Sequence, residues 1–71
     1  MNTSAAKPWI NYQIDRYGSD ALITIERVWL EGDKVHRVFI EEYETASRGA
    51  SKSAQKAAAK YATPDCPTLR G

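Results

Sequence analysis

The sequence predicts an α+β fold, in which a three-stranded antiparallel meander sheet is followed by one C-terminal helix packed on one face (β-β-β-α). Two runs rich in aromatic and β-branched residues, WINYQIDRY and ALITIERVWL, are separated by Gly18-Ser19, a pair suited to a type II′ turn. A third run, VHRVFIEEY, follows across a second tight turn at Gly32-Asp33. The last segment then changes to helical spacing, with small or aromatic residues at i, i+3, i+4 and i+7: Ala54, Ala57, Ala58 and Tyr61.

The two turns predict strand registers that agree with each other. The first turn places Tyr12 opposite Ile25, and the second places Ile25 opposite Ile40. A slip of one residue would move every side chain of a strand to the other face, so this agreement supports the meander. The predicted pairs are Ile14 with Ile23, Ile10 with Arg27, Arg27 with Val38 and Trp29 with His36. They place one set of residues on the face toward the helix: Ile10, Tyr12, Ile14, Ile23, Ile25, Trp29, Val38 and Ile40.

The predicted domain spans residues 8–63. Its helix follows Gly49, with Ser51 as the capping residue, and ends before Pro64, which removes a backbone donor. Residues 1–7 are small and polar, and residues 64–71 carry two prolines and a glycine, so we expect a flexible N-terminus and a loose C-terminal tail.

Length and charge exclude several classes of protein. A chain of 71 residues has room for one domain, and ten basic against nine acidic residues leave a formal charge of +1, which is not that of a strongly basic nucleic-acid-binding chain. The single cysteine, Cys66, cannot form a disulfide within the chain, which favours a reducing, cytoplasmic location. We expect no signal peptide and no membrane span, because no apolar run approaches the ~20 residues that a span requires.

The sequence offers little support for catalysis. His36 is the one histidine, and the predicted register places it beside Trp29, where it has a packing role. Cys66 has no acid-base partner nearby in the sequence, and one histidine with one distant cysteine does not form a structural zinc set. We therefore expect a protein that binds rather than catalyses, with no metal and no cofactor.

Basic residues are concentrated in the predicted helix and just before it. Between positions 46 and 63 there are four cations and no acid, a local charge of +4: Arg48, Lys52, Lys56 and Lys60. The three lysines recur every fourth residue and so form one outward ridge without a carboxylate at i±3 or i±4. This ridge is either a solvated helix face or a site for anions or nucleic acid.

The segment RGASKSAQKAAAKYA, after three strands, resembles the C-terminal part of the double-stranded RNA-binding domain. Its final helix begins with glycine, then Ser-Lys-Lys-x-Ala-Lys, then an alanine pair, and the matching positions here are Gly49, Ser51, Lys52, Lys56, Ala58 and Ala59. The resemblance implies that Lys52 and Lys56 contact phosphates. The first helix of that family, which reads an adjacent minor groove, has no counterpart in residues 1–7.

The uncovered face of the sheet is the second candidate surface. The registers place aromatic residues and an arginine there, a composition enriched in protein interfaces. Glu26 and Glu41 on this face disfavour a polyanion, so we expect a protein contact, although the tail or a second copy of the chain would also satisfy the pattern. The predicted contact residues are Trp9, Asn11, Val28, Arg37, Phe39 and Tyr43.

These features together indicate a small interaction protein. In size and plan it is similar to phage-encoded inhibitors such as anti-CRISPR proteins, which implies binding to a host protein or nucleoprotein complex through the open sheet face and the basic helix. One alternative is a nucleic-acid-binding protein that contacts phosphates of a duplex through Lys52, Lys56 and Lys60. The other alternative is a homodimeric structural subunit.

Overall fold

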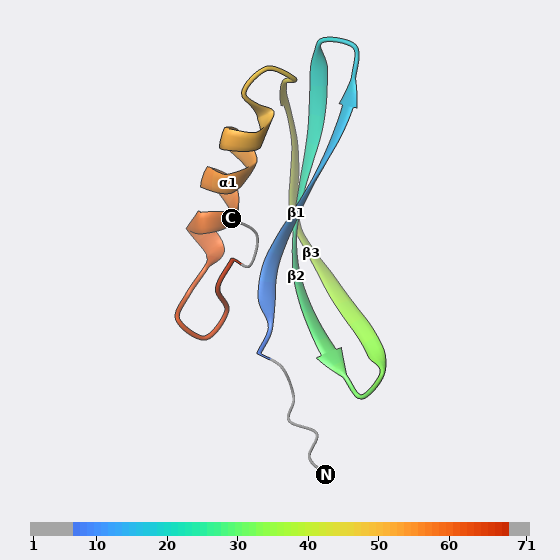
Figure 1. The fold of residues 1–71 in the computed structure, drawn as a ribbon, viewed down its shortest axis with the longest axis vertical. Coiled ribbons are helices and arrows are strands. Elements are labelled where there is room, and N and C mark those ends of the chain that lie inside the picture. Colours follow the sequence, from blue (N-terminus) through green and yellow to red (C-terminus); the bar gives the residue numbers. More distant parts are fainter. Residues whose placement is uncertain (1–6, 69–71) are drawn as a thin grey trace.

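The fold has the predicted order of elements (Figure 1). A computed structural model describes residues 7–68, and the expectations for residues 1–6 and 69–71 lie outside the described residues. Strands β1 (Trp9–Tyr17), β2 (Asp20–Glu31) and β3 (Lys34–Ala46) form one antiparallel sheet in the order β1-β2-β3, and helix α1 (Ala50–Tyr61) follows. The βββα prediction is confirmed.

Both predicted turns are present as two-residue loops. The pairs Tyr17–Asp20 and Glu31–Lys34 close them. Gly18 and Gly32 have φ angles of 63° and 65°, and no non-glycine residue among 7–68 has a positive φ. A positive φ at the first loop position alone is the pattern of a type II′ turn, which explains why glycine comes first in both loops.

The β1–β2 register is the one that the sequence predicts along its whole length, including Tyr12 opposite Ile25. The β2–β3 register agrees near the turn, where Trp29 pairs with His36. Between Ile25 and Glu26 it shifts by one residue at a β-bulge, so that Ile25 faces Glu41 instead of Ile40. The predicted Ile25–Ile40 pair is therefore wrong, because a tight turn fixes the register only as far as the first irregularity.

The bulge exchanges the two faces in the second half of β3. Tyr43, which we predicted on the uncovered face, lies on the helix side, where its hydroxyl donates to the Ser53 carbonyl over 3.1 Å. Tyr43 also pairs directly with buried Ile23. The extra residue at the bulge is Ile40, so the alternation restarts one position late and carries Tyr43 to the other side.

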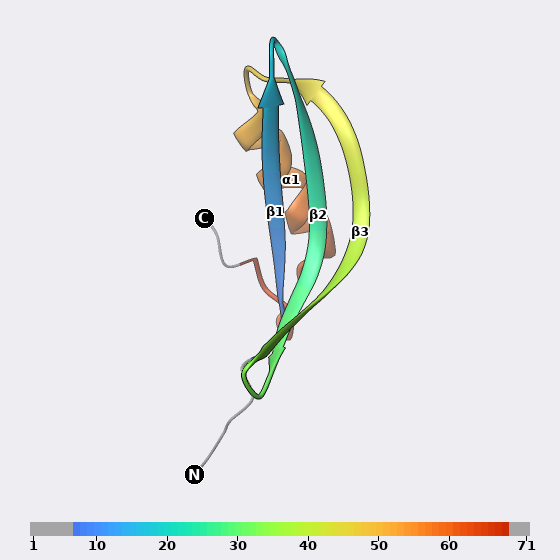
Figure 2. The same ribbon diagram turned by 90° about the vertical axis from the view of Figure 1, so that its right-hand side faces the viewer.

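The helix lies across β1 and β2, while β3 curves away at the side (Figure 2). Its inner face consists of alanines that are buried completely or nearly so, above fully buried Ile23 and Ile25. Small side chains let the helix approach the sheet closely, so the isoleucines fill the core. The buried alanines are Ala50, Ala54, Ala57 and Ala58.

The helix begins differently from the prediction. Gly49 is the N-cap residue, with a left-handed φ of 82°, and no side chain of residues 7–68 caps the helix by a hydrogen bond. Ser51 is the second helical residue and does not act as the cap, so that prediction is wrong. The turn before the helix needs a left-handed residue, and glycine adopts that conformation without strain.

The segment after the helix is ordered, contrary to the prediction for residues 64–68. Thr63 and Cys66 exchange two backbone hydrogen bonds of 3.0 Å, and the Ile10 N–H donates to the Pro67 carbonyl over 2.9 Å. A parallel bridge joins Ile10 to Thr68, and buried Cys66 belongs to the core. The chain thus returns to the edge of β1 that does not pair with β2.

Candidate functional site

The face of the sheet opposite α1, called the open face below, brings together five of the six predicted contact residues. Adjacent positions across the three strands form two rows, Trp9–Val28–Arg37 and Asn11–Glu26–Phe39. Leu30 pairs with Val35 at the β2–β3 turn and continues the same face. Tyr43 is the predicted residue that the bulge removes from this set.

One end of the open face is apolar and accessible. It is called the apolar end below and comprises Trp9, Val28, Leu30, Val35 and Phe39. Phe39 is 61% exposed and Val35 54% exposed, whereas Val28 lies buried between its neighbours. The β2–β3 hairpin that carries much of this surface extends beyond the last turn of α1 (Figure 1). Grouped exposed apolar side chains of this kind mark contact surfaces more often than scattered ones do.

Glu26 organises the polar part of this surface. Although it is on the open face, it is 8% exposed, and its carboxylate accepts a hydrogen bond from Asn11 Nδ2 over 2.8 Å. Arg37 Nη1 lies 3.4 Å from the same oxygen, Oε2, while the arginine side chain stays half exposed. A carboxylate that is mostly removed from water needs such partners. Glu26 therefore orients Arg37, which pairs with Val28 and shares the open face with Phe39.

The other end of the open face is acidic. It is called the acidic end below and comprises Asp15, Asp20, Glu42 and Glu44, all exposed. The Tyr17 hydroxyl donates to Glu44 Oε2 over 2.5 Å, and this hydrogen bond raises the pKa of Tyr17 to about 12. Tyr17 thus remains a neutral donor in the acidic end. Because the bulge moves Glu42 and Glu44 onto this face, the acidic end is larger than a regular β3 would make it.

The basic ridge, formed by Lys52, Lys56 and Lys60, lies on α1, on the side of the sheet opposite the open face, and Arg48 lies just before the helix. Arg48, Lys52, Lys56 and Lys60 are all exposed, and the first turn of α1 contains no acidic residue. Among residues 7–68 no carboxylate forms an ion pair with these four side chains. Lys60 Nζ lies 5.8 Å from the centre of the Tyr61 ring. The sheet therefore separates a basic surface from an acidic and apolar one.

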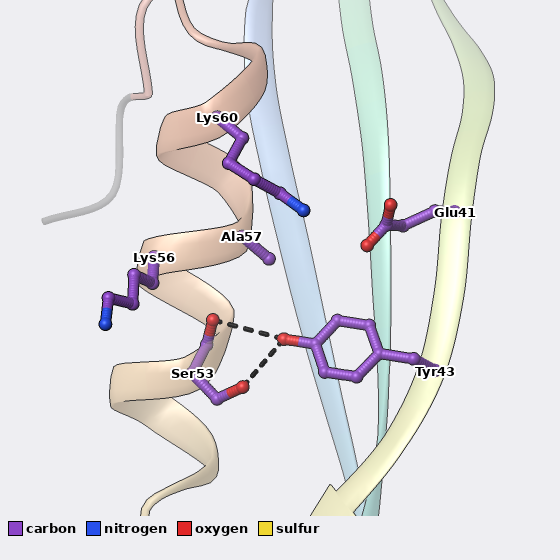
Figure 3. A pocket seen from close by; sticks show the side chains of 6 residues that line it. All are labelled: Glu41, Tyr43, Ser53, Lys56, Ala57 and Lys60. Carbon is purple, nitrogen blue, oxygen red and sulfur yellow. Dashed lines mark hydrogen bonds between the residues drawn. The ribbon is translucent and has the colours of Figure 1, made fainter.

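A groove runs between α1 and β3 (Figure 3). It encloses about 480 Å³ and is lined by Glu41, Tyr43, Ser53, Lys56, Ala57 and Lys60. Tyr43 and Ser53 bond to each other across it, with 2.8 Å between their hydroxyl oxygens, and the Tyr61 hydroxyl donates to Glu41. That bond raises the pKa of Tyr61. The groove exists because the helix covers β1 and β2 more than β3, and its Tyr43, Ser53 and Glu41 side chains each have a hydrogen-bond partner.

His36 packs beside Trp29, as predicted. The two rings stack with centroids 5.3 Å apart and an interplanar angle of 15°, and the Arg27 guanidinium lies 5.3 Å from the Trp29 ring. His36 Nε2 also lies 2.9 Å from Glu31 Oε1. These contacts stabilise the end of the β2–β3 hairpin. In the described part of the chain, no three His, Cys, Asp or Glu side chains come together as a metal site.

Comparisons with known proteins add no family to this description. No protein-family model, curated protein or solved structure matches the chain. The chain between residues 7 and 68 forms no helix with the length and apolar character needed to cross a membrane.

Proposed function

We propose that the protein is a small non-catalytic interaction protein and that the apolar end of the open face binds a partner protein. The observation that carries this proposal is the group formed by Arg37 and Phe39. Arg37 is held by Glu26 over 3.4 Å, and Phe39, in the neighbouring row, is 61% exposed. Aromatic residues and arginine supply most of the binding energy at protein interfaces, and an oriented arginine loses less conformational entropy on binding.

The surroundings of this group also favour a protein as the partner. Trp9 and Val28 lie in the row of Arg37, and polar Asn11 lies in the row of Phe39, so that an apolar centre has a polar margin. Typical interfaces have this arrangement. The acidic end on the same face would repel the phosphates of a nucleic acid. A protein partner does not meet this repulsion.

The narrower proposal is an inhibitor of the phage type, similar in plan to anti-CRISPR proteins, that acts on a host protein or nucleoprotein complex in the cytoplasm. Its support is the placement of a basic helix and an apolar–acidic face on opposite sides of one small sheet. Such a molecule offers one surface to protein and another to nucleic acid. The unpaired thiol of Cys66, buried in the core, suits a reducing compartment.

The second candidate function is binding to duplex nucleic acid through the basic ridge. Lys52 and Lys56 are exposed and have no carboxylate partner among residues 7–68, which leaves their charge available to phosphates. The resemblance of this helix to the last helix of the double-stranded RNA-binding domain points in the same direction. This function would depend on the helix and not on the open face.

A capture experiment from lysate of the native host tests the proposal. Immobilised parent protein is compared with three variants: Trp9→Ala in the apolar end, Gln13→Ala as a matched control on the same strand and face, and the double variant Lys52→Glu/Lys56→Glu. Each lysate is run with and without nuclease. We expect Trp9→Ala to weaken capture of a defined partner by about thirtyfold, the effect of losing an interface anchor. Gln13→Ala and the lysine variant should retain it.

The opposite pattern supports the second candidate. Capture that requires the lysines, disappears with nuclease and tolerates Trp9→Ala would contradict the proposed protein contact. Thermal melting of each variant distinguishes loss of capture from loss of the fold.

A further inference from the structure

The two edges of the sheet differ in what covers them. At the β1 edge the chain's own C-terminal segment is bonded to Ile10. At the β3 edge no segment of residues 7–68 pairs with the strand, which is 13 residues long. An open edge exposes a row of unpaired backbone N–H and C=O groups, which is a template for a further strand. The helix does not obstruct this edge, because it lies over β1 and β2.

The charges of β3 select which strand fits this edge. The first half of the strand carries Lys34, His36 and Arg37, and the second half carries Glu41, Glu42 and Glu44. Charged residues at an edge normally discourage pairing with arbitrary strands. An antiparallel copy of β3, however, places the basic half of one strand beside the acidic half of the other. The pattern therefore disfavours foreign strands and favours the strand itself.

The β-bulge makes this self-pairing consistent with the two faces of the sheet. Before the bulge Arg37 and Phe39 are on the open face, and after it Glu42 is on the open face while Glu41 and Tyr43 face the helix side. If Phe39 lies opposite its own copy and Ile40 stays unpaired in each strand, Arg37 faces Glu42 of the other copy. His36 then faces Tyr43, and both pairs join residues of the same face.

We infer that β3 pairs with β3 of a second copy of this chain, in antiparallel orientation, to form a homodimer with one six-stranded sheet. The two-fold axis passes between the two Phe39 residues, perpendicular to the sheet, so both helices lie on the same face. Two Arg37–Glu42 pairs flank the axis. Trp9 stays outside the dimer contact, since β1 is the strand farthest from the axis. Arg37 and Phe39 belong to both surfaces, whereas Trp9 belongs to the partner contact alone, so Trp9→Ala tests the partner contact separately from the dimer.

Charge-reversal variants test this pairing by light scattering after size exclusion, over a range of protein concentrations. Arg37→Glu and Glu42→Arg each place like charges opposite each other twice per dimer, and we expect each to raise the dimer Kd by at least about tenfold. A mixture of the two variants should form a heterodimer. In it the two substituted side chains face each other with opposite charges, and the native Glu42 of one chain faces the native Arg37 of the other. The double variant Arg37→Glu/Glu42→Arg should also dimerise.

The mixture separates the dimer from effects within one chain. Arg37 also contacts Glu26 of its own chain, so Arg37→Glu alone can disturb the open face. A second chain that carries only Glu42→Arg cannot repair that contact, so restoration of the dimer in the mixture must come from the pairing between chains. If the single variants do not fold, cross-linking in a Cys66→Ala background provides the second measurement.

In the cross-linking experiment, Phe39→Cys should form an intermolecular disulfide under mild oxidation. The Cα atoms of directly opposite residues lie roughly 4.5 to 5.5 Å apart, within the range that a disulfide spans. The matched control, Gln13→Cys, is exposed on the open face of β1, and its two copies would be separated by five strand spacings, or roughly 24 Å. A parent that stays monomeric at the highest attainable concentration overturns the inference. So does a dimer that ignores both charge reversals, or one that cross-links as readily through Gln13→Cys.

Discussion

The two faces of this sheet are built from alternate residues of the same three strands, yet they have different roles. The covered face has Ile23 and Ile25 fully buried under helix alanines that are as deeply buried. The open face has Phe39 and Val35 mostly exposed around an arginine held by Glu26. Burial against the helix accounts for the stability of the fold, and what remains exposed on the other side is available for binding. Substitutions on the two faces should therefore affect different measurements.

The largest effect is expected for Ile25→Ala on the covered face. Ile25 is fully buried in the central strand, between Tyr12 and Glu41, and its truncation leaves a cavity under the helix. We expect a loss of roughly 2 to 5 kcal/mol in the free energy of unfolding, which is most of the stability of a domain this small. Thermal and urea melts measure it. A melting temperature within a few degrees of the parent would show that the covered face is not the core.

A smaller effect is expected where the chain enters the helix that covers one of the two faces. Gly49 has a φ of 82°, and a Cβ there would meet no atom of the described residues within 4 Å, so Gly49→Ala is strained without being obstructed. We expect a cost of about 1 to 2 kcal/mol in the free energy of unfolding. The matched control is Ser51→Ala, which should be near neutral because Ser51 caps nothing. A larger loss for Ser51→Ala than for Gly49→Ala would contradict the assignment of the cap.

The pKa of Tyr17 should report the hydrogen bond that Tyr17 donates to Glu44 at the acidic end of the open face. The bond to Glu44 raises the pKa of Tyr17 from 10.0 to about 12 in the folded protein. A raised pKa in the folded state means that this bond contributes stability below about pH 10, and that the contribution is lost as the pH rises through about 12. Ultraviolet titration of the phenol measures it, and Glu44→Gln should move the Tyr17 titration back toward 10.0. An unchanged titration in that variant would show that the Tyr17–Glu44 bond is absent.

Strand order, both turns and the inner face of the helix were predictable because each depends on local chemistry. Glycine at the first loop position specifies the turns, and the alanine spacing specifies the buried helix face. The bulge was harder, since it arises from the fit between β2 and β3. Its trace in the sequence is the run Val38-Phe39-Ile40, after which Tyr43 is out of phase with an alternating pattern.

Two further features depend on contacts between distant segments. Residues 64–68 return along β1 with Cys66 in the core. A short stretch of prolines around one cysteine does not predict this packing. The role of Glu26 could have been found, because the predicted register already places it opposite Asn11 and one row from Arg37. The sequence indicates only that Glu26 is a charge that repels polyanions, and its function as the partner of Arg37 comes from the geometry.

The most direct test of the difference between the two faces is the free energy of unfolding of Phe39→Ala, measured by urea melts at low protein concentration so that the monomer dominates. Phe39 is the most exposed large apolar residue of the open face, whereas Ile25 is fully buried on the covered face. We predict a change within about 0.5 kcal/mol, as for other exposed positions, with the cooperativity of unfolding unchanged. A loss comparable to that of Ile25→Ala would mean that the open face belongs to the core and would contradict its assignment as a binding surface.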